Sequence, residues 1–212
     1  MPVHAIPGLG HDSNIFLISG SRPILVDAGT GMHGRKVMER LQPLLRGTLD
    51  RLVLTHRHFD HVGGAYDINE RFHPDILMHE LDAASLEQGD DKTSAAVMFG
   101  CELRPMQTKH LLGGEVLDTG EHRFEVIHTP GHTIGSICLF EGRTKILISG
   151  DTVFAEGVGR WDLPTGDHEA LLGSVKKLLS LNPKDIYPGH GACSIGNASD
   201  SINEALQILG EY

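Results

Sequence analysis

The sequence predicts a mixed α/β fold in a single domain that spans residues 1–212. Short apolar runs typical of buried strands alternate with stretches whose apolar residues recur at helical spacing. This alternation occurs in both halves of the chain, and no linker-like segment separates them. At 212 residues, with 40% apolar and 22% charged residues, the chain is long enough to bury a substantial core.

In the first half, strands are expected at 14–18, 23–26, 52–54 and 76–78. A helix is expected over 34–45, where Val37, Leu41, Leu44 and Leu45 follow helical spacing. A second helix is expected to begin near Asp60 and to continue through 65–72, and a shorter one covers 79–86. The stretch 89–114 contains a break near 89–93 and gives no clear pattern.

In the second half, the pattern resumes with expected strands at 124–127, 137–140 and 146–148. Two helices are expected at 169–181 and 199–209, with a short strand at 186–187 between them.

Composition limits the classes of partner. A net charge of −10 argues against nonspecific nucleic-acid binding, which requires a basic surface. We expect no membrane association, because no run approaches the 18 apolar residues of a membrane span and the N-terminus does not resemble a signal peptide. The three cysteines form no C-x-x-C pair, which favours a reducing, cytoplasmic location.

Four metal-competent side chains lie within six residues, in the pattern H-x-H-x-D-H. Imidazole nitrogens and carboxylate oxygens are ligands that Zn²⁺ and Fe²⁺ prefer. Histidines two residues apart can project to the same side of an extended segment, and the Asp and His that follow can open a helix and turn back toward the same point. A polar loop that is merely rich in histidine is the alternative, but similar residues recur downstream. The segment therefore predicts four metal ligands: His56, His58, Asp60 and His61.

Three later motifs each follow a short apolar run, where a strand gives way to a loop. They are Thr-Pro-Gly-His-Thr at 129–133, Ser-Gly-Asp-Thr at 149–152 and Tyr-Pro-Gly-His-Gly at 187–191. Any one of them would be a weak signal. Together they add His132, Asp151 and His190 to the candidate ligands.

In this order the motifs resemble the metallo-β-lactamase fold superfamily, and Leu-Val-Asp-Ala-Gly at 25–29 is similar to its first motif. The resemblance covers nearly the whole chain. It implies an αββα sandwich, in which two sheets lie face to face with helices outside. Asp27 is expected to be structural, because it can support the loop beneath the ligands.

The resemblance also implies two divalent metal ions, zinc first, with iron or manganese as alternatives. By position in the family pattern, the first ion would be held by His56, His58 and His132. The second would be held by Asp60, His61 and His190, with Asp151 as the bridge. A hydroxide shared by the two ions would supply the nucleophile at neutral pH. Asp60 and Asp151 are the candidate catalytic residues.

Residues 150–164, which read G-D-T-V-F followed by G-R-W-D, resemble the glyoxalase II branch and its persulfide dioxygenase relatives. Arg160 could bind a substrate carboxylate or pair with Asp162. Trp161 could line the substrate mouth or pack internally. Arg57 and Phe59 occupy variable positions of the histidine motif and are not expected to be ligands.

The resemblance implies hydrolysis of a small thiolester, such as S-lactoylglutathione or a related anionic substrate. Only 22 residues (212 − 190) follow His190, too few for the C-terminal helical domain of glyoxalase II enzymes, so a short form is expected, for which another thiolester or a smaller thiol conjugate is an alternative to the glutathione ester. One alternative is a persulfide dioxygenase with a single Fe²⁺ held by His56, His132 and Asp151. Another is a lactonase.

Overall fold

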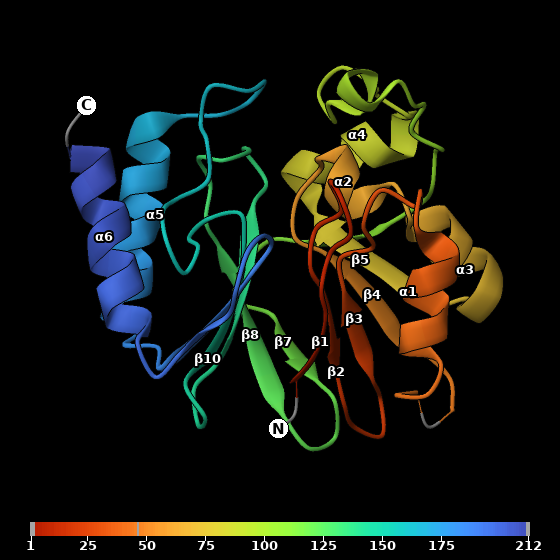
Figure 1. The fold of residues 1–212 in the computed structure, drawn as a ribbon, viewed down its shortest axis with the longest axis horizontal. Coiled ribbons are helices and arrows are strands. Elements are labelled where there is room, and N and C mark those ends of the chain that lie inside the picture. Colours follow the sequence, from red (N-terminus) through yellow and green to blue (C-terminus); the bar gives the residue numbers. More distant parts are fainter. Residues whose placement is uncertain (1–2, 46, 211–212) are drawn as a thin grey trace. The chain divides into compact units, whose positions relative to one another are not determined.

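The computed structural model describes residues 3–45 and 47–210, and the chain forms two compact units. The N-terminal unit comprises residues up to 111 together with 118–122. The C-terminal unit comprises 112–117 and the chain from 123 onward. Each unit contributes a six-stranded sheet and its own helices (Figure 1).

In the N-terminal unit the strands follow one another across the sheet in chain order. The first two pairings are antiparallel, and the next three are parallel. The strands are β1 (Val3–Ile6), β2 (Ile15–Ile18), β3 (Ile24–Val26), β4 (Arg51–Leu54), β5 (Asp75–His79) and β6 (Lys109–Leu111).

The helices of this unit cover one face of its sheet. Alternate strand residues such as Leu52 and Leu54 point to that face, where they share a buried core with Leu41 and Ile68 of the helices. The helices are α1 (Gly34–Leu41), α2 (Phe59–Val62), α3 (Ala65–Phe72), α4 (Glu80–Gln88) and the 3₁₀ helix η1 (Ala96–Phe99).

The C-terminal unit repeats this plan with a different topology. Its strands lie in the order β12-β11-β10-β9-β8-β7, and helices α5 and α6 lie side by side (Figure 1). Leu147 and Ile186 of the sheet share a buried core with Val175 and Ile202 of the helices. The elements are β7 (Val116–Asp118), β8 (Arg123–His128), β9 (Ile137–Glu141), β10 (Ile146–Gly150), α5 (His168–Ser180), β11 (Asp185–Pro188), β12 (Ser194–Ile195) and α6 (Ala198–Gly210).

The predicted core elements are confirmed, with two differences in the helices. The helix expected over 34–45 ends at Leu41 with Gln42 as its C-cap, and Pro43, the next residue, has no backbone N–H with which to continue the helical hydrogen bonds. The helix expected to run from Asp60 through 72 is split into α2 and α3 at Gly63 and Gly64. A Cβ atom on Gly64 would lie 2.2 Å from the Ala28 carbonyl oxygen, so the backbone there is held against the loop after β3.

Four further strands lack a sequence signal strong enough to predict them. These are β1, β6, β7 and β12, the outermost strands of the two sheets. They are two to four residues long and mostly carry exposed or polar side chains. The 3₁₀ helix η1 occupies the stretch that gave no clear pattern.

Strand direction determines where the motif residues emerge within each unit. Because β3 and β4 are parallel, Asp27 and the histidine motif leave the N-terminal sheet at the same edge. In the C-terminal unit β8 is antiparallel to β9, β9 is antiparallel to β10, and β10 is parallel to β11. Strands β8, β10 and β11 therefore run in one direction, and His132, Asp151 and His190 all follow their carboxyl ends. Among the described residues, no helix is both long and apolar enough to cross a bilayer.

Candidate metal centre

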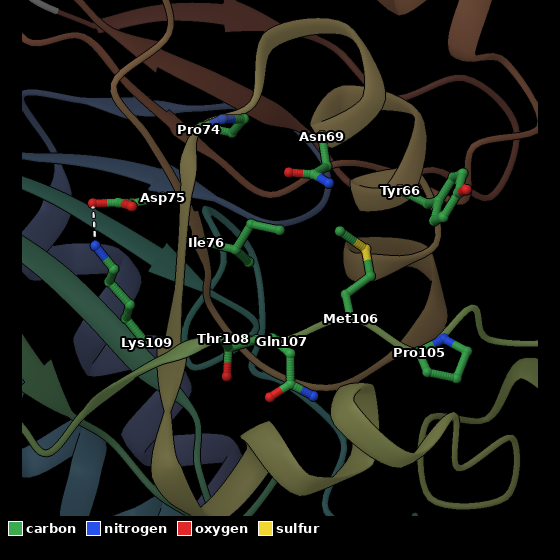
Figure 2. A pocket seen from close by; sticks show the side chains of 10 residues that line it. All are labelled: Tyr66, Asn69, Pro74, Asp75, Ile76, Pro105, Met106, Gln107, Thr108 and Lys109. Atoms are coloured by element: carbon green, nitrogen blue, oxygen red, sulfur yellow. Dashed lines mark ion pairs between the residues drawn. The ribbon is translucent and has the colours of Figure 1, made fainter.

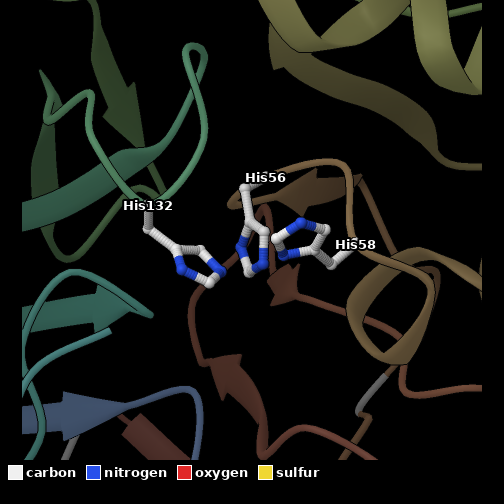
Figure 3. Close-up of side chains that lie close together, drawn as sticks. All are labelled: His56, His58 and His132. Carbon is white, nitrogen blue, oxygen red and sulfur yellow. The ribbon is translucent and has the colours of Figure 1, made fainter. Parts of the chain in front are cut away.

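The histidine motif follows β4 and continues into α2. His58 keeps an extended backbone at the N-cap of α2, with φ −66° and ψ 145°, while Asp60 and His61 lie within the helix. The rings of His56 and His58 are 4.9 Å apart between centroids and nearly perpendicular (Figure 3). The rings of His56 and His61 are 4.1 Å apart. The N-terminal unit thus gathers the predicted ligands of this motif.

Asp27 supports the histidine motif through contacts with Thr55 and His61. Its Oδ1 accepts a hydrogen bond from the Thr55 backbone N–H at 2.8 Å, and its Oδ2 lies 2.8 Å from Nδ1 of His61. A carboxylate can only accept in this contact, so Nδ1 of His61 carries the proton and Nε2 keeps its lone pair. The residue adopts φ 63°, a left-handed conformation that Asp tolerates better than most residues. These contacts agree with the structural role expected for Asp27.

Arg57 points away from the ligands, as its variable position in the motif suggests. Its Nε donates to Oδ1 of Asp82 at 2.8 Å, and its backbone N–H donates to Oδ2 of the same carboxylate at 2.9 Å. The guanidinium also donates to the Leu81 carbonyl oxygen and to Thr93 Oγ1. Both members of this ion pair are buried, so Arg57 holds the motif loop against the start of α4. No sequence signal pointed to Asp82, which is 25 residues away from Arg57.

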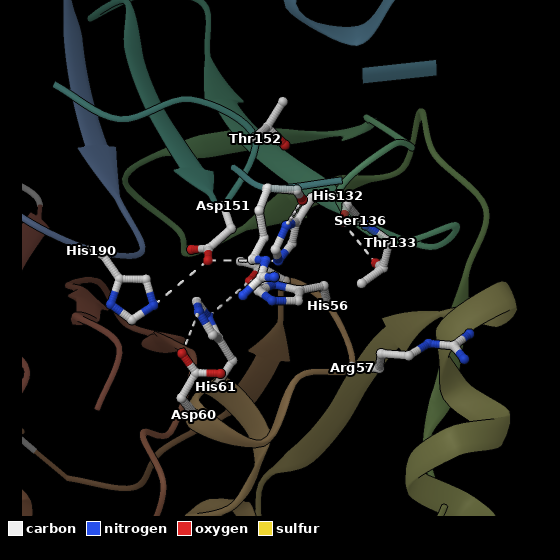
Figure 4. Close-up of polar contacts among 12 residues, drawn as sticks. His56, Arg57, Asp60, His61, His132, Thr133, Ser136, Asp151, Thr152 and His190 are labelled. Carbon is white, nitrogen blue, oxygen red and sulfur yellow. Dashed lines mark hydrogen bonds and ion pairs between the residues drawn. The ribbon is translucent and has the colours of Figure 1, made fainter. Parts of the chain in front are cut away.

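The C-terminal unit contributes the three later ligand candidates. Oδ2 of Asp151 lies 3.7 Å from Nε2 of His132 and 3.6 Å from Nε2 of His190 (Figure 4). In the N-terminal unit, Oδ2 of Asp60 lies 3.8 Å from Nε2 of His61. These separations exceed a hydrogen bond. Two donor atoms at about 2.1 Å from one tetrahedral ion would be roughly 3.4 Å apart, so the donor atoms within each unit are suitably spaced for divalent metals.

His132 is oriented by a backbone oxygen. Its Nδ1 lies 2.7 Å from the carbonyl oxygen of Arg160, which leaves Nε2 facing Asp151. The chain can approach this closely because residue 159 is glycine. A Cβ atom on Gly159 would lie 1.8 Å from the Asp151 carbonyl oxygen and 3.2 Å from Nδ1 of His132. The loop before Arg160 therefore supports two predicted ligands through its backbone.

The two predicted substrate residues have internal partners. Arg160 forms the bidentate pair with Asp162 that the sequence offered as an alternative, with both N–O distances at 2.7 Å. The guanidinium lowers the pKa of the Asp162 carboxyl. Trp161 packs against the core of the C-terminal unit and makes an edge contact with His168, with ring centroids 5.1 Å apart. Contact of either residue with a substrate stays a prediction.

A cavity of about 330 Å³ opens beside His190 in the C-terminal unit. The Phe154 ring contacts the His190 ring edge-on, at 6.2 Å between centroids. Glu156, the acidic residue of the lining, belongs to no sequence motif that predicts a functional role. The cavity is lined by Phe154, Ala155, Glu156, His190, Gly191 and Ala192.

Another cavity, of about 390 Å³, lies in the N-terminal unit (Figure 2). Asp75 and Lys109 form an ion pair of 2.6 Å at its border. Because β4 and β5 are parallel and Arg51 is paired with Asp75, this cavity lies at the opposite end of the strands from the histidine motif. It therefore takes no part in the candidate centre.

Cys138 is unsuited to act as a nucleophile. Its side chain is fully buried, and burial raises the pKa of the thiol to about 11. The thiol is therefore protonated at neutral pH. Cys138 is thus a core residue of the C-terminal unit.

Similarity to known proteins supports the same interpretation. Residues 8–190 match the family model of the metallo-beta-lactamase superfamily. A probable metallo-hydrolase of Methanocaldococcus jannaschii is 38% identical, over 87% of this chain and 90% of its own. The hydroxyacylglutathione hydrolase GloC of Haemophilus influenzae is 31% identical, over 91% and 92%. The acyl-coenzyme A thioesterase MBLAC2 of Gallus gallus is 31% identical, over 85% and 73%.

Solved structures show the same fold. BLEG-1, a B3 metallo-beta-lactamase, has a TM-score of 0.80 and 28% identity, and the match covers 95% of both chains. TTHA1623 in a di-iron-bound form has a TM-score of 0.78 and 30% identity, with 95% of this chain and 96% of that chain covered. The expected α/β fold of the metallo-β-lactamase type is thereby confirmed. The residues that match the family model, 8–190, include every predicted ligand. This chain belongs to the metallo-β-lactamase superfamily and is a metallo-hydrolase of that family.

Proposed function

We propose that this metallo-hydrolase cleaves a small thiolester at a centre of two divalent metal ions. The observation that supports it most is the spacing within each unit, where the donor atoms of Asp60 and His61 and those of His132, Asp151 and His190 lie 3.6–3.8 Å from a neighbour in the set. Two relatives named for thiolester hydrolysis, GloC and MBLAC2, support the substrate class. The proposed ligands are His56, His58, Asp60, His61, His132, Asp151 and His190.

The chain's own residues prepare this centre. Asp27 contacts Nδ1 of His61, and the Arg160 carbonyl oxygen contacts Nδ1 of His132. Each ring can therefore offer the lone pair of Nε2 to a metal ion. Metal ions bound there would act as Lewis acids and lower the pKa of a bound water to about 7. Asp151 is the proposed bridging ligand, and we assign Asp60 to accepting a hydrogen bond from the attacking water. The departing thiol has a pKa near 8.5, so it leaves without a strong general acid.

The proposal is tested by the variant Asp151→Asn. We measure metal per chain by mass spectrometry and turnover of S-lactoylglutathione and acetyl-coenzyme A. The expected result is metal content below two ions per chain and a loss of kcat of at least about a thousandfold, because the amide cannot bridge two cations. Asp75→Asn is the matched control, since Asp75 lies at the opposite end of the N-terminal sheet. Full metal content and activity in Asp151→Asn would rule out the assignment.

The same measurements address the persulfide dioxygenase alternative. The di-iron form of TTHA1623, 30% identical, makes iron a metal to test here. A single iron per chain, with oxygen uptake on glutathione persulfide and no thiolester turnover, would replace the hydrolase proposal with the dioxygenase. Turnover of acyl-lactones alone would replace it with the lactonase.

A further inference from the structure

The Arg160–Asp162 pair is a fork-to-fork contact on the surface of the C-terminal unit. Nε and one terminal nitrogen of Arg160 each donate to a different oxygen of Asp162, both at 2.7 Å. The side chains remain 54% and 64% exposed. This bidentate geometry is the one by which arginine binds a ligand carboxylate. Asp162 thus occupies the donors that an anionic ligand would use.

Arg160 is anchored at the candidate centre by its backbone. Its carbonyl oxygen lies 2.7 Å from Nδ1 of His132, and the preceding Gly159 is packed against the Asp151 backbone. The guanidinium therefore starts from a residue that touches a proposed metal ligand. A molecule bound at His132 would therefore lie next to the residue that carries the guanidinium.

The C-terminal unit carries a further acidic residue near the proposed ligands. Glu156 lines the cavity beside His190, and the whole chain carries a net charge of −10. With its guanidinium already paired, Arg160 attracts an incoming carboxylate less than an unpaired guanidinium would. A substrate whose thiol portion is neutral meets no such competition.

We propose that Asp162 is a specificity-determining residue, which competes with substrate carboxylates for Arg160 and so favours thiolesters with an uncharged thiol portion. This inference rests on the proposed thiolester hydrolase function. The competition is modest, because an exposed ion pair is weak and its removal changes affinity by about two- to fivefold. Asp162 acts on binding and not on the reacting atoms, so the effect belongs in KM.

The test compares two lactoyl thiolesters with the metal-loaded enzyme. S-lactoylglutathione carries carboxylates on its thiol portion, and S-lactoyl-N-acetylcysteamine is neutral. Asp162→Asn is expected to lower KM for the glutathione ester by about two- to fivefold, with kcat unchanged, and to leave KM for the neutral ester unchanged. The gain should disappear in the double variant R160Q/D162N, because the released guanidinium is then absent.

Asp75→Asn is the matched control, since it removes one charge from another exposed ion pair, with side chains 53% and 65% exposed. An equal change for both esters, or the same change in the control, would overturn the inference in favour of a general charge effect. No change for either ester would also overturn it.

A binding measurement separates this inference from the proposed function. The Kd values of S-methylglutathione and S-methyl-N-acetylcysteamine are measured by calorimetry for the same variants. If no thiolester is hydrolysed but Asp162→Asn still tightens binding of S-methylglutathione alone, the proposed function fails and the competition stands. If thiolesters are hydrolysed and neither Kd nor KM responds, the function stands and the competition is wrong.

Discussion

The imidazole of His61 is oriented by a carboxylate that lies 34 residues earlier in the chain. Asp27 Oδ2 is 2.8 Å from Nδ1, and the Ala28 N–H donates to the His61 carbonyl oxygen at 2.8 Å. A carboxylate behind an imidazole fixes the tautomer and raises the basicity of the opposite nitrogen. His132 has the same arrangement with a neutral backbone oxygen in place of the carboxylate.

Asp27→Asn is expected to weaken metal binding by about 10- to 100-fold with little loss of fold. Asparagine keeps the size of the side chain and tolerates the left-handed backbone, but it removes the negative charge behind His61. Metal affinity is measured by competition with a chelator. Glu87→Gln is the matched control, because Glu87 also faces a histidine, His110, at 3.0 Å, outside the proposed ligand set. Equal affinities in the two variants would contradict the role given to Asp27.

Among the secondary-structure elements, two glycines determine how closely the end of α2 approaches the loop that follows β3. A Cβ atom on Gly63 would lie 2.5 Å from the Thr30 carbonyl oxygen, and one on Gly64 would lie 2.2 Å from that of Ala28. These contacts separate α2 from α3 and hold the end of the histidine motif against the loop that carries Asp27. Since the obstructing atoms belong to the backbone, they cannot move aside as a flexible side chain would.

Gly64→Ala is therefore expected to lower the free energy of unfolding by roughly 1–3 kcal/mol. Gly173→Ala is the contrasting variant, because Gly173 lies within α5 and has no neighbouring atom within 4 Å of the added Cβ. It should raise the free energy of unfolding by about 0.5–1 kcal/mol, since alanine is the better helix former. Urea unfolding measures both, and a stabilised Gly64→Ala would show that the close approach is not required.

At the scale of the whole molecule, the proposed ligands are distributed over residues 56–190, so an unfolded chain presents no preformed site. Binding to the native state alone stabilises a protein by about 2.7 kcal/mol when free metal is 100 times Kd. The metal should therefore contribute to folding as well as to turnover.

Removal of metal by a chelator is expected to lower Tm by roughly 5–10 °C, and zinc should restore it. The measurement is differential scanning calorimetry of the wild type and of Asp151→Asn. The variant should respond less, because it lacks the proposed bridging ligand. Identical melting curves with and without metal in the wild type would contradict coupling between binding and folding.

Much of the fold could be predicted because its central elements carry strong local patterns. Strands β2 to β5 and β8 to β11 are apolar runs bounded by turns, and α5 and α6 show helical spacing. The strands that were not predicted lie at the sheet edges, where short polar segments pair only because a neighbouring strand is present. The break between α2 and α3 likewise depends on the distant Ala28 and Thr30.

Motif spacing and hydrophobic period are local properties of the chain, so they are enough to predict the chemical kinds of candidate ligand, their order and their places after strands. The atoms that support these candidate ligands become visible only in the folded chain. Asp27 lies behind His61, Asp82 holds Arg57, and the Arg160 carbonyl oxygen faces His132. The folded chain also pairs the Arg160 guanidinium with Asp162, which is one of the two partners that the sequence allows. Most of these partners are 25–34 residues apart, so packing and strand direction, which no local pattern encodes, bring them within hydrogen-bond distance.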